Sequence, residues 1–152
     1  MSDQNLSAFI WSVADLLRGD YRQSDYGKVI LPFTVLRRLD CVLEAKKPAV
    51  LAEFASKRNL NLPLAPFLTM AAGMAFYNTS ALDFQRLQDD SHNIGANTLL
   101  YVQSFSENVR DLFEKFEFAA TVERLASANL LLKIVQKFAS YSGPRNSDQA
   151  IS

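Results

Sequence analysis

The sequence of 152 residues contains little cysteine, histidine, glycine or proline: one, one, five and five residues. Because Cys41 has no second cysteine to pair with, we expect no internal disulfide and a reducing, cytoplasmic compartment. His92 stands alone in a polar stretch, and one histidine without other good ligands does not form a metal site. The glycines are scattered, so there is no GxGxxG or P-loop to hold phosphates. We therefore expect neither a metal nor a nucleotide cofactor in this chain.

Long hydrophobic runs and an excess charge of one sign are also missing. No apolar run reaches the roughly 18 residues that a membrane span needs, and Asp15 and Arg18 interrupt the first hydrophobic stretch. We expect no targeting segment and no membrane contact. Sixteen basic and sixteen acidic residues give zero net charge, which is not the charge of an autonomous nucleic-acid-binding domain. Any DNA contact must therefore be local.

Acid-base and nucleophilic chemistry also lack a recognisable pattern. Asp89 and Asp90 lie in a polar stretch, and the sequence around them shows no burial that would shift a pKa. Cys41 has no neighbouring histidine to activate it, so it is expected to be a small, buried or half-buried space-filling residue. The sequence predicts no catalytic residue.

The charges that are present divide the chain into two parts. Residues 18–58 contain nine Lys or Arg and five Asp or Glu, a local charge of +4, whereas residues 83–123 contain three and eight, a local charge of −5. The basic part offers phosphate-contact candidates, and the acidic part offers a surface for a basic protein partner. The alternative is that both charged parts are solvated helix surfaces. The cations in question include Arg37, Arg38, Lys46 and Lys47.

The apolar residues recur with a helical period. A stripe over residues 6–17 ends before Gly19, and a second helix is expected from Ser24 to about Lys46 or Lys47, where Pro48 would end it and Pro32 would kink or divide it. No run alternates with the period of a strand. We predict an all-α, compact multi-helix domain with short connecting loops over residues 1–141, followed by a linker or tail over 142–152. Further helices are expected at about 48–57, 67–74, 80–90, 97–105 and 106–116.

Two helix positions need a partner that the stripes do not supply. Trp11 lies outside the apolar stripe of its helix, so it packs either on a second layer of this domain or on a partner protein. Asp40 lies at the edge of the second helix's apolar arc, where an unpaired carboxylate is costly, and Arg37 is its simplest partner. Arg38 points away from the stripe, into solvent or toward a ligand.

Three blocks of sequence carry a resemblance to a known family. WSVADLLRGDYRQSDYGKVILPFTVLRRLDCVLE (residues 11–44), FYNTSALDFQRLQDDSHNIGANTLLYVQSFSENVRDLFEKFEF (76–118) and NLLLKIVQKF (129–138) are similar to the N-terminal helical domain of the modification (M) subunit of type I restriction-modification systems. The resemblance covers about residues 6–140. It implies a parent protein that transfers a methyl group from S-adenosylmethionine to adenine N6 in a bipartite DNA target.

The resemblance also implies a division of labour between domains. Members of this family have their cofactor-binding and catalytic motifs in a Rossmann-like domain that follows the helical one, and neither motif occurs in these 152 residues. The implied partners are a specificity subunit, a second M subunit, a restriction subunit and double-stranded DNA. We therefore expect an assembly and DNA-clamping domain with no cofactor of its own. The alternative is a pure protein-interaction module that uses Trp11 and the acidic part, without DNA contact.

Overall fold

The structure, a computed structural model, describes residues 2–141, so the predicted linker or tail at 142–152 lies outside the described residues. Within that range the chain forms helices and no strand, which confirms the predicted all-α fold. None of these helices is long and apolar enough to cross a bilayer. The α-helices are α1 (Ser2–Leu17), α2 (Tyr26–Leu43), α3 (Lys47–Lys57), α4 (Ala65–Ala72), α5 (Phe84–Leu87), α6 (Ile94–Gln103), α7 (Glu107–Lys115), α8 (Phe118–Ser127) and α9 (Leu131–Ala139). Three 3₁₀ turns accompany them: η1 (Gln23–Asp25), η2 (Glu44–Lys46) and η3 (Gln88–Asn93).

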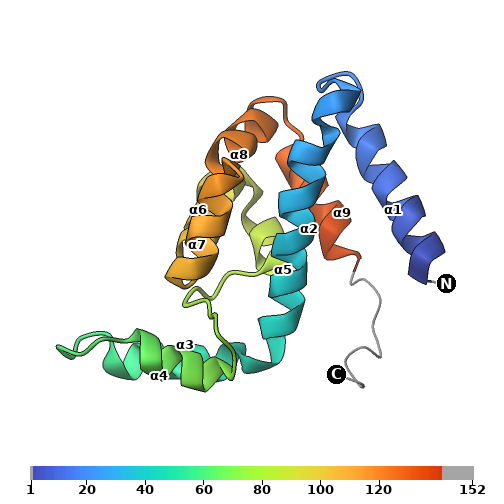
Figure 1. Cartoon of the computed structure of the whole chain (residues 1–152). Helices are drawn as coiled ribbons and strands as arrows, with labels where there is room; N and C mark the ends of the chain where they lie inside the picture. The colour runs from blue at the N-terminus through green and yellow to red at the C-terminus, as the bar shows by residue number, and fades with distance from the viewer. Residues whose placement is uncertain (1, 142–152) are drawn as a thin grey trace.

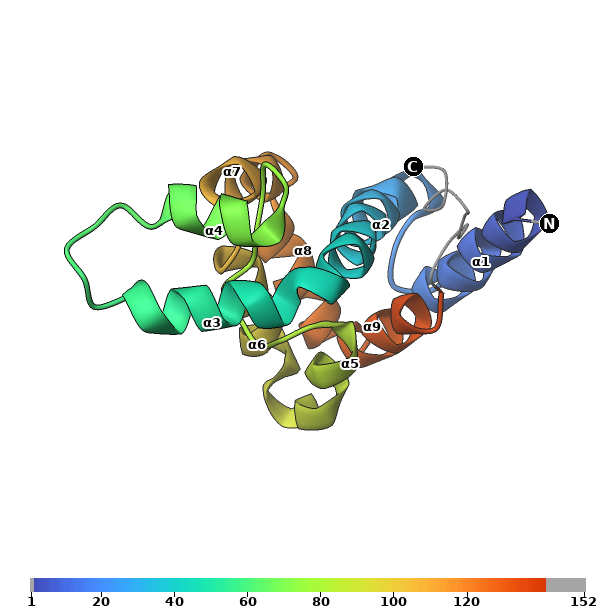
Figure 2. The same cartoon turned by 90° about the horizontal axis from the view of Figure 1, so that it is seen from below.

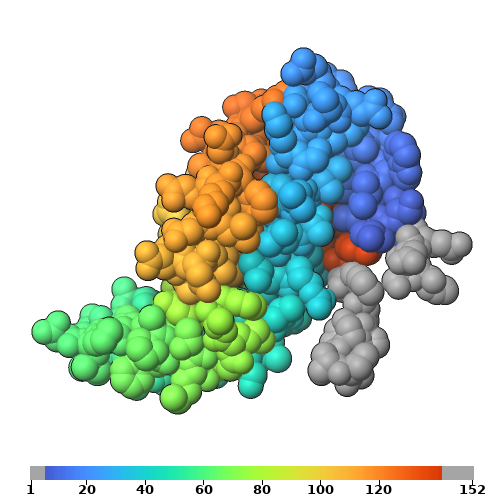
Figure 3. Space-filling view, in the orientation of Figure 1, coloured from blue at the N-terminus to red at the C-terminus, as the bar shows by residue number. Residues whose placement is uncertain are grey.

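Helix α2 forms the centre of the domain. Helices α1 and α9 pack on one side of it, and α8, which packs with α6 and α7, lies on the other (Figures 1 and 2). Helices α3 and α4 pack against each other and project from the foot of α2 as a two-helix arm (Figure 3). The fold is therefore a helical body with one projecting arm.

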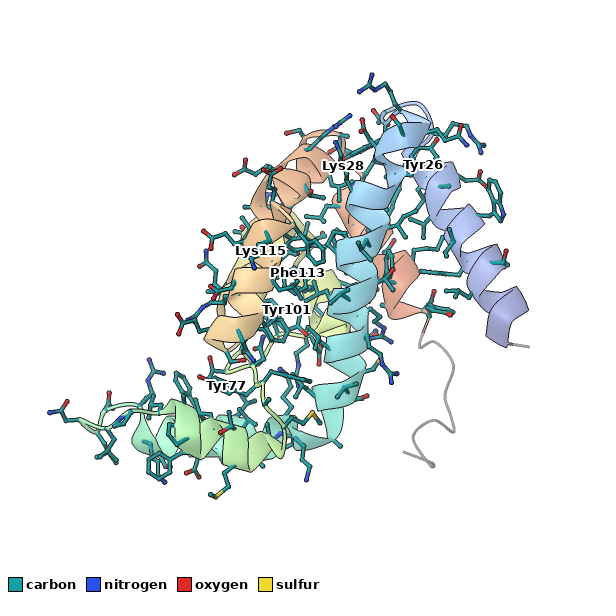
Figure 4. The ribbon with its side chains drawn as sticks, viewed as in Figure 1. Tyr26, Lys28, Tyr77, Tyr101, Phe113 and Lys115 are labelled. Carbon is teal, nitrogen blue, oxygen red and sulfur yellow. The ribbon has the colours of Figure 1, made fainter. Side chains whose placement is uncertain are left out.

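Aromatic rings fill the interior of the body. The Phe33 side chain of α2 is fully buried, and its ring centroid lies 5.1 Å from that of Phe118 and 5.7 Å from that of Phe138. A second row of rings runs from Tyr101 through Phe105 and Phe113 to Phe118. Figure 4 shows Tyr101 and Phe113 pointing into the space between α2 and the α6–α7 pair. These two rows join α2, α6, α7, α8 and α9 into one core.

Helix α1 buries only part of its apolar stripe. Val13 and Leu17 are fully buried, whereas Ile10 is 38% exposed. Gly19 has φ of +100°, a left-handed conformation that glycine adopts without strain, and the helix ends just before it, as predicted. Trp11 is 62% exposed, so a second layer of this domain does not cover it. The first alternative for Trp11, that it packs on a second layer of this domain, is therefore wrong.

Two expectations for the second helix are wrong: Pro32 does not divide it, and Pro48 does not end it. Helix α2 starts at Tyr26, ends at Leu43 and runs through Pro32 without a break. Pro48 does not end that helix but stands in the first turn of α3. Proline is tolerated there because the first N–H groups of a helix have no intrahelical acceptor.

Two cations of the α3–α4 arm lie over aromatic rings, and one of them links the two helices. The Lys57 ammonium lies 5.1 Å from the centroid of the Phe67 ring and 2.8 Å from the Glu53 carboxylate. The Arg58 guanidinium lies 5.0 Å from the centroid of the Phe54 ring. Lys57 and Arg58, the basic residues at the far end of the arm, therefore make their contacts within the arm.

Candidate functional site

A cluster of polar groups around Asp40 is the most elaborate polar arrangement in the domain. Asp40 lies near the C-terminal end of α2, with its side chain almost fully buried. Its Oδ1 accepts a 2.6 Å hydrogen bond from the Tyr101 hydroxyl of α6. Its Oδ2 accepts one from Arg37 Nη1 at 3.0 Å and one from the Phe84 backbone N–H at 3.3 Å. One carboxyl group thus ties together α2, α5 and α6.

Arg37 extends this cluster to the end of α9. Its Nε donates to the Tyr141 carbonyl at 3.0 Å, and its Nη2 donates to the Ala139 carbonyl at 3.0 Å. Carbonyls at the C-terminal end of a helix lack intrahelical donors, and a guanidinium satisfies them well. The guanidinium also lies 5.5 Å from the centroid of the Phe84 ring. The predicted pairing of Arg37 with Asp40 is confirmed, and the same side chain anchors α9.

Lys47 and Asn78 hold the loop between the arm and α5 against the cluster. Lys47 Nζ donates to the Ser80 carbonyl at 2.6 Å and lies 5.8 Å from the centroid of the Tyr101 ring. The buried Asn78 donates from Nδ2 to the Tyr101 carbonyl at 2.9 Å, and its Oδ1 accepts from the Ser80 N–H at 2.7 Å. These bonds fix residues 78–80 beside α6.

Burial governs the electrostatics of the cluster. Burial raises the pKa of Asp40, although the hydrogen bonds from Tyr101 and Phe84 and the charge of Arg37 act in the opposite direction. Burial and the adjacent Asp40 carboxyl group raise the pKa of Tyr101 well above its usual value. Burial lowers the pKa of Lys47. A cavity of 180 Å³ lies among these side chains, but their hydrogen bonds go to other parts of the chain, so the cluster's chemistry is structural.

The four predicted DNA-contact residues divide into two pairs. Arg37 and Lys47 are half-buried, and their side chains donate hydrogen bonds within the domain. The side chains of Arg38 and Lys46 are exposed. The Lys46 side chain runs along Gly73, where an added Cβ would lie 4.0 Å from Lys46 Cε. Lys46 therefore lies at the foot of the arm, beside the C-terminal end of α4.

The remaining chemically reactive residues form no second cluster. Cys41 is half-buried, and burial raises the pKa of its thiol, which disfavours the reactive thiolate. His92 is exposed in η3. Asp90 accepts hydrogen bonds from Asn93 and Asn97. Within residues 2–141, no three His, Cys, Asp or Glu side chains are placed to hold a metal ion.

Sequence reasoning missed two members of the cluster, Tyr101 and Asn78. Asp40 and Tyr101 are 61 residues apart, and neither the period nor the composition of the sequence links them. Asn78 lies in an extended stretch whose backbone pairs with the α6–α7 link, with the Ser106 N–H bonded to the Tyr77 carbonyl at 2.9 Å. The one available signal was the lack of a helical period between residues 75 and 80, which marks the stretch as irregular.

The fold and the cluster define a class: an all-helical domain whose long-range polar contacts tie one central helix to the segments around it. The family model of the HsdM N-terminal domain matches residues 6–138, and the chain belongs to this family. This match confirms the resemblance to the N-terminal domain of the type I restriction-modification M subunit. No curated protein and no solved structure matches the chain.

Proposed function

We propose that this domain serves assembly and DNA clamping in a type I restriction-modification complex in the cytoplasm. The parent M subunit transfers a methyl group from S-adenosylmethionine to adenine N6, working with a specificity subunit, a second M subunit and a restriction subunit. Methylation of a base inside a duplex requires the base to be flipped out, which favours a separate element that closes over the DNA. Membership of the HsdM N-terminal domain family supports the part of this proposal that places the domain in a type I M subunit.

The observation that carries the DNA-clamping part is the exposure of Arg38 and Lys46. Both lie in the stretch where α2 ends and the projecting arm begins. Exposed basic side chains contact DNA phosphates without reading sequence, which suits a domain that clamps rather than selects the target. Arg37 and Lys47 have a structural part in this proposal, because their hydrogen bonds fix α9 and the loop at Ser80.

Reversal of both exposed charges tests the proposal. We expect Arg38→Glu combined with Lys46→Glu to weaken DNA binding by the assembled complex about tenfold or more and to slow methylation. Two phosphate contacts fewer also reduce the slope of log affinity against log salt by about 2. DNA affinity is measured by fluorescence anisotropy at several salt concentrations.

A matched control reverses two exposed cations elsewhere, Arg22 on the loop before η1 and Lys133 on α9. The control variant has the same net charge as the test variant, and we expect it to keep nearly wild-type affinity. Equal DNA affinity of wild-type and Arg38→Glu/Lys46→Glu complexes would refute the clamping role of these residues.

A second candidate function is a protein-interaction role without DNA contact, and the exposure of Trp11 favours it. Exposed tryptophans are enriched among the residues that dominate protein interfaces. If Trp11 anchors another subunit, Trp11→Ala weakens assembly of the complex at least tenfold while the isolated chain keeps its thermal stability. Size-exclusion chromatography and a melting curve measure the two effects. Normal assembly of the variant removes Trp11 from the interface.

A further inference from the structure

A groove between α6, α7 and α8 lies apart from the Asp40 cluster. Its volume is 590 Å³, and Leu99, Val102 and Ala119 supply apolar surface along it. Phe113 and Phe118 line it from below, and both rings belong to the buried core, so the groove's floor is fixed by packing. The groove is thus an open, partly apolar depression between three helices, with a floor that belongs to the core.

One edge of this groove carries a row of carboxylates. Glu107, Asp111 and Glu114 of α7 line it at spacings of four and three residues, which places them on one helix face. All three are exposed, and among residues 2–141 none of them forms an ion pair. The nearby Arg110 donates instead to the Phe105 carbonyl at 3.2 Å. The row repels itself, and cations at the same spacing would relieve that repulsion.

We propose that this groove binds a basic amphipathic helix of another protein subunit. Apolar side chains on one face of such a helix pack in the groove over Leu99 and Val102. Lysines or arginines beside that face pair with Glu107, Asp111 and Glu114, because helices that lie side by side present charges at the same period. The charge complementarity selects a basic helix over an acidic one. This inference deepens the proposed assembly role and rests on it for the partner's identity as a subunit of the complex.

The direct test uses a synthetic 18-residue helical peptide with a leucine row flanked by lysines, titrated into the 152-residue chain. A peptide with glutamates in place of the lysines is its matched control. We expect the lysine peptide to bind at least tenfold more tightly than the glutamate peptide. In NMR spectra of the isotope-labelled chain, we expect the peptide to change the chemical shifts of backbone amides in α6, α7 and the start of α8.

Charge reversal then locates the contact. We expect Glu107→Lys/Asp111→Lys/Glu114→Lys to lose at least tenfold in affinity for the lysine peptide and to gain affinity for the glutamate peptide. The gain cannot come from unfolding, so it keeps the test valid if stability changes. Reversal of three exposed carboxylates outside the groove, Asp15, Asp20 and Asp89, matches the net charge and is expected to leave the peptide preference unchanged.

Two results would overturn the proposal: equal loss of lysine-peptide binding in both triple variants, which indicates bulk charge attraction, or no preference between the peptides in the wild-type chain. Neither result bears on Arg38 and Lys46, whose role is measured by DNA affinity. Failure of the groove and failure of the DNA clamp are therefore distinguishable.

Discussion

Asp40→Ala is expected to lower the free energy of unfolding by about 3–5 kcal/mol, because it removes the carboxylate that accepts hydrogen bonds from Tyr101, Arg37 and the Phe84 N–H. The Tyr101 hydroxyl, which donates to Asp40 at 2.6 Å, loses its acceptor at the same time. A net stability of about 5–15 kcal/mol is usual for a domain, so the change removes a large share of it. Position 40 therefore matters for folding more than any surface charge does.

Urea unfolding followed by circular dichroism measures this effect. The matched control is Asp15→Ala, which removes the carboxylate of an exposed pair with Arg18, also three residues apart. Exposed pairs contribute about 0–1 kcal/mol, so the control is expected to remain close to wild type. Equal unfolding midpoints for Asp40→Ala and Asp15→Ala would show that the Asp40 cluster does not hold the domain together.

Phe33→Ala is expected to cost about 3–5 kcal/mol, since it opens a cavity at the meeting point of three helices. The ring is fully buried and contacts the rings of Phe118 on α8 and Phe138 on α9. Partial collapse of the surrounding side chains sets where in that range the value falls.

Leu31→Ala is the control for this substitution. Leu31 lies two positions earlier on α2 but is 55% exposed, so its loss leaves no enclosed cavity. We expect a cost below about 1 kcal/mol. Thermal unfolding of the two variants compares them, and a similar drop in both would mean that Phe33 is not central to the core.

Much of the fold follows from the sequence because most helices bury one regular face. The stripe containing Val13 and Leu17 predicts α1 and its end before Gly19 correctly. Helix starts are harder to predict, because serine and aspartate are both good N-cap residues and either can begin the helix. The sequence predicts a helix from about residue 80, but α5 begins at Phe84, and Asp83 caps it by accepting from the Arg86 N–H at 2.7 Å.

The candidate site is predictable only where its members are close in sequence. Arg37 and Asp40 lie three residues apart on one helix, so their pairing follows from helix geometry alone. The contacts of Arg37 with Ala139 and Tyr141 span more than 100 residues, and no pattern in one sequence reports them. The charge of a residue likewise says nothing about which way its side chain points, and this is why Lys46 and Lys47 looked equivalent.

The most direct test of the DNA-clamping account is a photochemical cross-link from position 46 in the assembled complex bound to duplex DNA. The label is attached to Lys46→Cys in a Cys41→Ser background, with Lys133→Cys on α9 as the matched control. The account predicts a strong cross-link to DNA from position 46 and little from position 133. No cross-link from position 46 above the control level would contradict it.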